Sequence, residues 1–185
     1  MSDDTFTLEP PDTIESVVAE LDRLTPAMPL SADAVPRVET SDRIVVFELC
    51  GSVYGCSLEH VSEVQRIPAM TRLPNTPEWL CGVSNLRGEV VSIVDWRAFF
   101  DLPEAGVNPH RRVLILRSLQ EELRVGVIVD KLVGLRTSGK LHPATTHSSG
   151  GIDRYLRGVS TIQALTIGLI DVEQWIASDE LRQFG

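Results

Sequence analysis

The sequence predicts a mainly β fold built from small antiparallel barrels. Along residues 43–185, short segments rich in Val, Ile and Leu recur at regular spacing and are separated by turns that often carry Gly, which is typical of barrel strands. Helical periodicity is confined to short stretches of this region. Of the 185 residues, 43% are hydrophobic and 23% are charged, so the chain is long enough and apolar enough to bury a core.

The predicted elements begin with a β-hairpin. Residues 44–49 and 53–58 are apolar or alternating, and Gly51-Ser52 between them can turn. Further strands are expected at Glu89–Val94, Arg112–Leu116, Arg124–Val129, Leu156–Ile162 and Leu165–Ile170. Two short helices are predicted, one over Asp95–Phe100 and a C-terminal one that Asp171 opens as N-cap. The apolar residues of the second helix fall close to one face: Val172, Trp175, Ile176 and Leu181.

The first 42 residues differ in charge from the rest. They hold ten acidic and two basic side chains, so they carry a net charge of −8, nearly all of the net charge of −9 of the whole chain. Five prolines interrupt the same segment. Such a composition disfavours a packed core. We therefore expect residues 1–42 to form an acidic, partly disordered arm, and residues 43–185 to form the folded domain.

Within this arm, residues 13–24 are predicted to form an amphipathic helix. Apolar side chains recur there at the spacing of one helical face: Ile14, Val17, Val18, Leu21 and Leu24. Asp12 and Glu15 lie at its start and Pro26 ends it. A helix this short is marginal in isolation, so the stripe needs an apolar surface. That surface belongs either to the chain's own domain or to a partner, in which case the five residues form a partner-docking helix.

Composition also excludes several classes of function. The acidic balance argues against a nucleic-acid or anionic-membrane binder, since both need a positive surface. No apolar run reaches the roughly 18 residues of a membrane span, and the N-terminus lacks the features of a signal peptide, so we expect a cytoplasmic protein without direct membrane insertion. The three cysteines, Cys50, Cys56 and Cys81, form no C-x-x-C pair, which favours buried reduced thiols over disulfides or metal ligands.

The sequence lacks the common signatures of catalysis. It has no phosphate-binding G-x-x-x-x-G-K-[ST], no G-x-G-x-x-G, no H-E-x-x-H and no G-x-S-x-G. His142 and His147 lie in a segment dense in Gly, Ser, Thr and Pro, which indicates a surface loop rather than a metal site. We therefore expect no enzyme, no cofactor and no metal. A small-molecule sensor with an enclosed pocket and a β-barrel enzyme remain as competing functions.

One segment is more informative than composition. Phe47-Glu48-Leu49, then Tyr54–Val64, then Thr71–Gly88 with its Asn85-Leu86-Arg87-Gly88 end, and then Ile93–Arg97 follow one another. In order and spacing this resembles the CheW family, the coupling proteins of bacterial chemotaxis arrays. The resemblance extends over Gly126–Leu132, Tyr155–Val159 and Gly168–Val172, and so covers about residues 43–182. Trp96 stands where the family usually has Leu, and Gly168 lies in a normally apolar strand.

The resemblance implies a fold and a function. The fold is two small five-stranded SH3-like barrels packed side by side, with short helices including a C-terminal one. The function is that of a non-catalytic adaptor in two-component signalling, which couples a methyl-accepting chemoreceptor to a CheA-type histidine kinase at membrane-associated receptor arrays. An adaptor of type IV pilus (twitching) motility or of another chemosensory pathway is the alternative within the family.

The resemblance also places the receptor-binding residues. Carried over by position, they are Val61, Glu63, Gly82 and Arg87, in a segment expected at the groove between the barrels. Each has a structural alternative: Val61 could belong to the core, Glu63 and Arg87 could form a solvated ion pair, and Gly82 could serve a turn or bulge. The kinase-binding surface is expected on the other barrel, without named residues.

Overall fold

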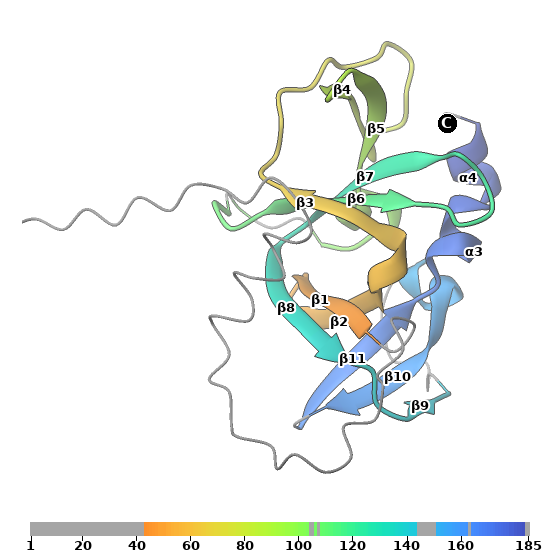
Figure 1. Ribbon diagram of the computed structural model, residues 1–185. Helices are drawn as coiled ribbons and strands as arrows, with labels where there is room; N and C mark the ends of the chain where they lie inside the picture. Colours follow the sequence, from red (N-terminus) through yellow and green to blue (C-terminus); the bar gives the residue numbers. More distant parts are fainter. Residues whose placement is uncertain (1–42, 104–105, 107, 144–150, 163, 184–185) are drawn as a thin grey trace, which may run out of the picture.

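The computed structural model describes residues 43–103, 106, 108–143, 151–162 and 164–183 (Figure 1). The predicted helix over residues 13–24, its apolar stripe and His147 lie outside these described residues. The fold is mainly β, as the sequence predicts, and its strands form two sheets that lie one above the other in Figure 1.

The first sheet, here called the terminal sheet, joins strands from both ends of the described chain. Its strands are β1 (Arg43–Leu49), β2 (Ser52–Ser57), β8 (Lys131–Thr137), β9 (Leu141–His142), β10 (Leu156–Ile162) and β11 (Leu165–Ile170), in the order β8-β1-β2-β11-β10-β9. β8 and β9 are separated only by residues 138–140, and they pair with opposite ends of the sheet. The sheet therefore curls like a five-stranded barrel in which β8 and β9 share one bent segment.

The second sheet, the central sheet, holds the middle of the chain. Its strands are β3 (Val61–Gln65), β4 (Leu80–Leu86), β5 (Glu89–Asp95), β6 (Arg112–Arg117) and β7 (Arg124–Val129), in the order β3-β6-β7-β5-β4. The chain beyond β3 again curls to the far edge, because Thr71 forms a bridge with Val83 of β4. The two sheets thus follow the same plan, with one parallel pair each, β11/β2 and β5/β7.

The sequence repeats with this plan. Residues 80–86 read LCGVSNL and residues 156–162 read LRGVSTI, and both strands shift register around their glycine. An aspartate at the end of β5 and one directly after β11 each cap a helix: Asp95 accepts a hydrogen bond from the Arg97 amide, and Asp171 accepts one from the Gln174 amide. These two caps confirm the predicted helix starts.

The helical elements of the described residues are all short. They are η2 (Leu58–His60), α2 (Trp96–Phe99), η3 (Gly151–Tyr155), α3 (Val172–Ile176) and α4 (Asp179–Arg182). η2 links the terminal sheet to the central sheet, while α2 and α3 follow the two capping aspartates. The predicted C-terminal helix is therefore present but broken into α3 and α4.

The main core lies between the sheets rather than inside either one. The cluster within the central sheet is small (Val91, Ile93, Val113, Ile115 and Ile128), as is the one within the terminal sheet (Ile44, Val46, Ile167 and Leu169). The largest cluster takes side chains from both sheets and from α2, η3, α3 and α4. At its centre Trp96 meets Trp175 edge to face, with ring centroids 5.2 Å apart. Each sheet therefore depends on the other for burial.

Candidate functional site

A surface pocket of about 250 Å³ opens at one end of the central sheet. Five strands line it, and its residues are Ser62, Glu63, Leu86, Arg87, Glu89, Val91, Ile115 and Arg124. Two of the predicted receptor-binding residues, Glu63 and Arg87, are among them. We call this the Arg87 pocket.

The structure brings Glu63 and Arg87 together from different strands. Arg87 Nη2 lies 3.6 Å from Glu63 Oε1, with 62% of the arginine side chain and 23% of the glutamate side chain exposed. The pair is thus a surface ion pair, which stabilises the fold by at most about 1 kcal/mol. Since most of the guanidinium remains in water, it can still bind an acidic group of a partner.

The backbone explains how Arg87 is presented. Arg87 and Gly88 form the two-residue turn between β4 and β5, with φ of +54° and +91°, as a type I′ hairpin requires. Asn85 Oδ1 accepts a hydrogen bond from the Gly88 amide at 2.9 Å and fixes the turn. The Asn-Leu-Arg-Gly sequence therefore folds into a rigid tip that carries Arg87.

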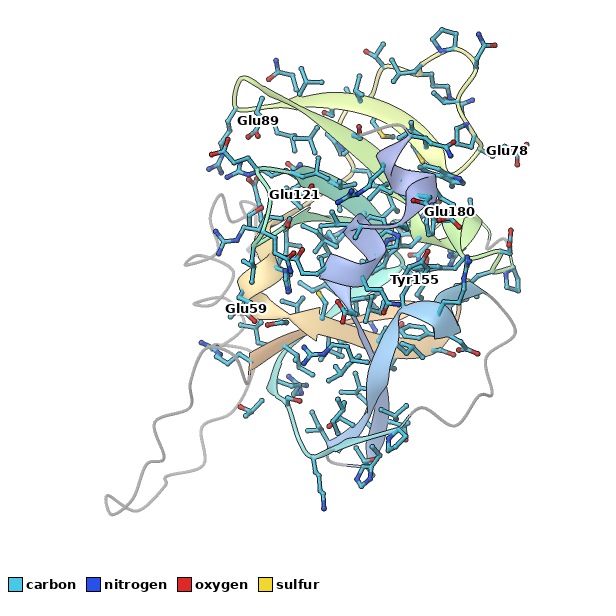
Figure 2. All side chains as sticks on the ribbon, turned by 90° about the vertical axis from the view of Figure 1, so that its right-hand side faces the viewer. Glu59, Glu78, Glu89, Glu121, Tyr155 and Glu180 are labelled. Atoms are coloured by element: carbon cyan, nitrogen blue, oxygen red, sulfur yellow. The ribbon has the colours of Figure 1, made fainter. Side chains whose placement is uncertain are left out.

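The sequence predicts this turn at the groove between the two barrels, but in the structure the turn lies away from the junction of the two sheets. β5 runs from the turn to Asp95, which caps α2 beside the main core. Figure 2 shows Glu89, just after the turn, at the opposite end of the hairpin from Glu78. All residues of the Arg87 pocket come from the central sheet. The site is therefore the end of one sheet rather than a cleft between two.

A second ion pair completes the pocket and was not predicted from the sequence. Arg124 Nη1 lies 2.8 Å from Glu89 Oε2, and both side chains are about half exposed. Arg124 opens β7 and Glu89 opens β5, and these strands are parallel neighbours. The pocket thus presents two cations and two carboxylates as two ion pairs, an arrangement that favours a polar partner surface over an apolar small molecule.

Val61 does not belong to this surface. Its side chain is 2% exposed and packs in the main core between the sheets. A bulge between Val61 and Glu63 shifts the register of β3 against β6, so that Val61 faces the core while Glu63 faces the pocket. Val61 is therefore part of the core, and its side chain is not exposed for a direct contact with a partner.

Gly82, in the part of β4 away from the turn, allows two backbone segments to lie close together. Its φ is +139°, and a Cβ there would lie 2.4 Å from the carbonyl oxygen of Thr71. The Val83 amide donates to that same oxygen at 2.9 Å. Only glycine lets the segment after β3 approach β4 this closely. Gly82 thus shapes the sheet that carries Arg87 and presents no side chain of its own.

We expect Gly82→Ala to destabilise the domain by about 3 kcal/mol or more, because it adds steric overlap with backbone to an unfavourable φ. Gly88→Ala is the matched control, since its φ is also positive but nothing lies within 4 Å of the added Cβ. Its cost should be about 1 kcal/mol. Urea denaturation measures both, and equal costs would show that the contact with Thr71 does not constrain β4.

The three cysteines are free thiols, and their surroundings raise the pKa of each one. Burial raises the pKa of the Cys56 thiol to about 12, and desolvation is also the main cause that raises the pKa of Cys50 and Cys81. All three thiols are free, and their raised pKa keeps them protonated and unreactive. Within the described ranges, no group of three or more His, Cys, Asp or Glu residues is placed to hold a metal ion.

A second pocket, of about 220 Å³, lies beside α3 and is lined mainly by polar side chains: Ser118, Gln120, Glu121, Glu173, Gln174, Ile176, Ala177 and Arg182. Like the Arg87 pocket, it is smaller and more polar than typical small-molecule sites. In the part of the chain that the structure covers, no helix is long and apolar enough to cross a membrane.

Comparisons with known proteins agree with the observed fold and identify a matching family and several relatives. A family model described as the CheW-like domain matches residues 43–180. The chemotaxis protein CheW of Klebsiella aerogenes is 29% identical over 139 residues, which cover 74% of this chain and 82% of that protein. Protein FrzA of Myxococcus xanthus is 32% identical over 113 residues, covering 61% of this chain and 67% of FrzA.

One further sequence relative and one solved structure also match the chain. Protein PilI of Pseudomonas aeruginosa is 30% identical over 114 residues, or 62% of this chain and 61% of PilI. The crystal structure of the scaffolding protein TtCheW from Thermoanaerobacter tengcongensis superposes with a TM-score of 0.68 at 23% identity, covering 82% of this chain and 96% of that one. At this identity the structural match supports the arrangement of the two sheets.

Proposed function

The chain belongs to the CheW-like domain family, and we propose that it is a non-catalytic adaptor that couples methyl-accepting chemoreceptors to a CheA-type histidine kinase. The observation that carries this proposal is the family match over residues 43–180, which includes nearly every described residue. The raised thiol pKa values and the paired carboxylates of the Arg87 pocket are consistent with binding rather than catalysis.

The Arg87 pocket is the proposed receptor-binding surface. A rigid turn holds Arg87 outward, Glu63 fixes its orientation, and Gly82 shapes the strand behind it. Charges placed in this way set the register of a partner helix more than they add affinity. The kinase is then expected on the terminal sheet, and binding to receptors would bring the cytoplasmic protein to membrane-associated arrays.

A second candidate within the family is an adaptor of another chemosensory pathway, such as the one that controls type IV pili. Two relatives support this second candidate. FrzA and PilI match this chain at 32% and 30% identity, close to the 29% identity of CheW from Klebsiella aerogenes. Co-purification of native receptors and kinases with the tagged full chain distinguishes the two pathways.

We expect Arg87→Glu to weaken binding to a receptor cytoplasmic fragment at least about tenfold, because it reverses the most exposed charge of the pocket. The melting temperature should stay within about 2–4 °C of the wild type, since 62% of the side chain is exposed. Calorimetric titration and a thermal scan check the two parts. Unchanged receptor affinity would contradict the assignment of this surface.

A charge swap is the matched control. Glu63→Arg combined with Arg87→Glu restores an ion pair in the opposite sense. If Arg87 contacts the receptor directly, the swapped variant stays impaired. If the swap recovers full affinity, the arginine acts only by orienting β3 against the turn.

A further inference from the structure

The outer face of the β4–β5 hairpin is covered at one end and open at the other. Leu80 and Val94 pair across the hairpin and are buried in the main core. Toward the turn, Asn85 pairs with Val90, whose side chain is 68% exposed. On this face Val90 is an exposed apolar side chain near the turn, and Ser92 separates it from the buried Val94.

The segment after β3 widens this face. The Thr71 amide donates to the Val83 carbonyl at 2.8 Å, and Ser84 Oγ donates to the Ala69 carbonyl at 2.9 Å, so residues 69–71 run beside β4. Side chains alternate along an extended segment, and Met70 packs on the interior cluster. Residues 67 and 73 therefore share the outer face. We call the surface formed by Ile67, Leu73, Val83 and Val90 the hairpin face; Val83 is half-buried and the other three are exposed.

Positive charge lies at the end of the hairpin face that is nearest the turn. Arg87 is exposed in that turn, three residues before Val90. Arg66 and Arg72 are exposed too, but they alternate with Ile67 and Leu73 and so share the side of Met70. An apolar surface with a cation at one end fits an amphipathic helix whose first turn is acidic.

We propose that residues 13–24 of this same chain dock on the hairpin face. Their apolar stripe runs from Ile14 to Leu24, about 15 Å along a helix, and residues 67–73 extend over roughly 20 Å. Acidic side chains flank the stripe, namely Asp12, Glu15, Glu20 and Asp22. The length of the stripe therefore fits the face, and the acidic residues at its start have the opposite charge to Arg87 at the turn.

The linker between the predicted helix and the folded domain is also long enough for the helix to reach the hairpin face. Eighteen residues, 25–42, separate the stripe from Arg43 at the start of β1. Extended, they span up to about 60 Å, more than the roughly 40 Å across a domain of this size. A tethered ligand with such a linker has an effective concentration of about a millimolar, so even a weak contact is populated.

Docking there has a regulatory consequence that rests on the proposed function. The hairpin face adjoins the turn that carries Arg87, so a docked arm would compete with the receptor for the same end of the central sheet. If the arm occupies the face for about 80–90% of the time, removing it should tighten receptor binding about five- to tenfold.

Amide chemical shifts of the full chain test the docking directly. Val18→Asp with Leu21→Asp breaks the stripe, while Ser16→Asp with Ala19→Asp adds the same charge to the opposite side of the predicted helix. We expect the first variant, and not the second, to shift amides of residues 67–73 and 83–92. The reciprocal change Val90→Asp, at an exposed position, should shift resonances of residues 13–24.

Other outcomes overturn the proposal. Shifts confined to another face mean that the arm docks elsewhere, and equal spectra for all variants mean that the stripe is kept for a separate partner. Shifts that vary with protein concentration point to a second copy of the chain. Titration with a receptor fragment separates the two proposals: docking without receptor binding by any variant refutes the proposed function alone, and binding without docking refutes only this inference.

Discussion

Trp96→Ala should destabilise the domain by about 3–5 kcal/mol, the usual cost of removing a buried large aromatic side chain. Trp96 is completely buried between the sheets and contacts Phe47 of the terminal sheet, Phe100 and Trp175. The clusters inside the individual sheets are small. Both sheets should therefore lose stability together, in one cooperative transition.

Hydrogen exchange measures this coupling strand by strand. Amides of β1 in the terminal sheet and of β6 in the central sheet should lose protection by the same free energy in the Trp96→Ala variant. Ile167→Ala is the control, since Ile167 is buried in the small cluster of the terminal sheet. If this control lowers the protection of β1 but leaves β6 unchanged, the sheets unfold separately and the shared core does not hold them together.

Hairpin strands and helix caps could be predicted because their signals are local. The strand segments 124–129, 156–162 and 165–170 have the predicted bounds, and both aspartate caps are present. The first hairpin turns at Cys50-Gly51, both with positive φ, one residue before the predicted turn. Alternation and turn chemistry are enough to place such elements.

The sequence does not predict strands β3, β4, β8 and β9. β3 and β4 contain register shifts, which interrupt the alternation of apolar and polar side chains. β10 contains such a shift as well and still has its predicted bounds, so the shift alone does not decide the outcome. β8 carries Gly134 at a φ of +139° opposite a shift in β1, and β9 has only two residues, so His142 lies in a strand rather than a loop. Irregular strands of this kind are recognised from their partners rather than from their own pattern.

The candidate site could also be predicted from the sequence only in part. The resemblance singles out Glu63 and Arg87, which the structure brings together, but it cannot report that the bulge turns Val61 into the core. The Arg124–Glu89 pair depends on the parallel pairing of β7 with β5, two strands that are distant in sequence. Such contacts between distant strands follow from topology and not from local spacing.

The second large effect is expected at the junction where the chain passes from the central to the terminal sheet. Asp130 lies between β7 and β8 and pairs with Arg97 of α2, and both side chains are more than nine-tenths buried. The Asp130 carboxylate also accepts from the Cys50 amide at 2.7 Å, and the Asp130 amide donates to the Glu48 carbonyl at 3.0 Å. One residue therefore ties the first hairpin to α2.

Arg97→Met should cost about 3–5 kcal/mol, because it leaves the Asp130 carboxylate buried without a counter-charge. Arg97→Met combined with Asp130→Leu should recover a large part of this loss, since removing both charges of a buried pair is often close to neutral. The double variant will not recover all of it, because the Cys50 amide also loses its acceptor. Urea denaturation of the two single variants and the double variant gives the coupling free energy.

The exposed pair Arg124–Glu89 serves as the matched control. Its side chains are 48% and 53% exposed, so Arg124→Met should cost less than about 1 kcal/mol. The buried pair differs from it in desolvation, with a carboxylate and a guanidinium enclosed at the point where the two sheets join. If Arg97→Met costs no more than Arg124→Met, or if the double variant is as unstable as the sum of the single ones, the junction does not depend on this ion pair.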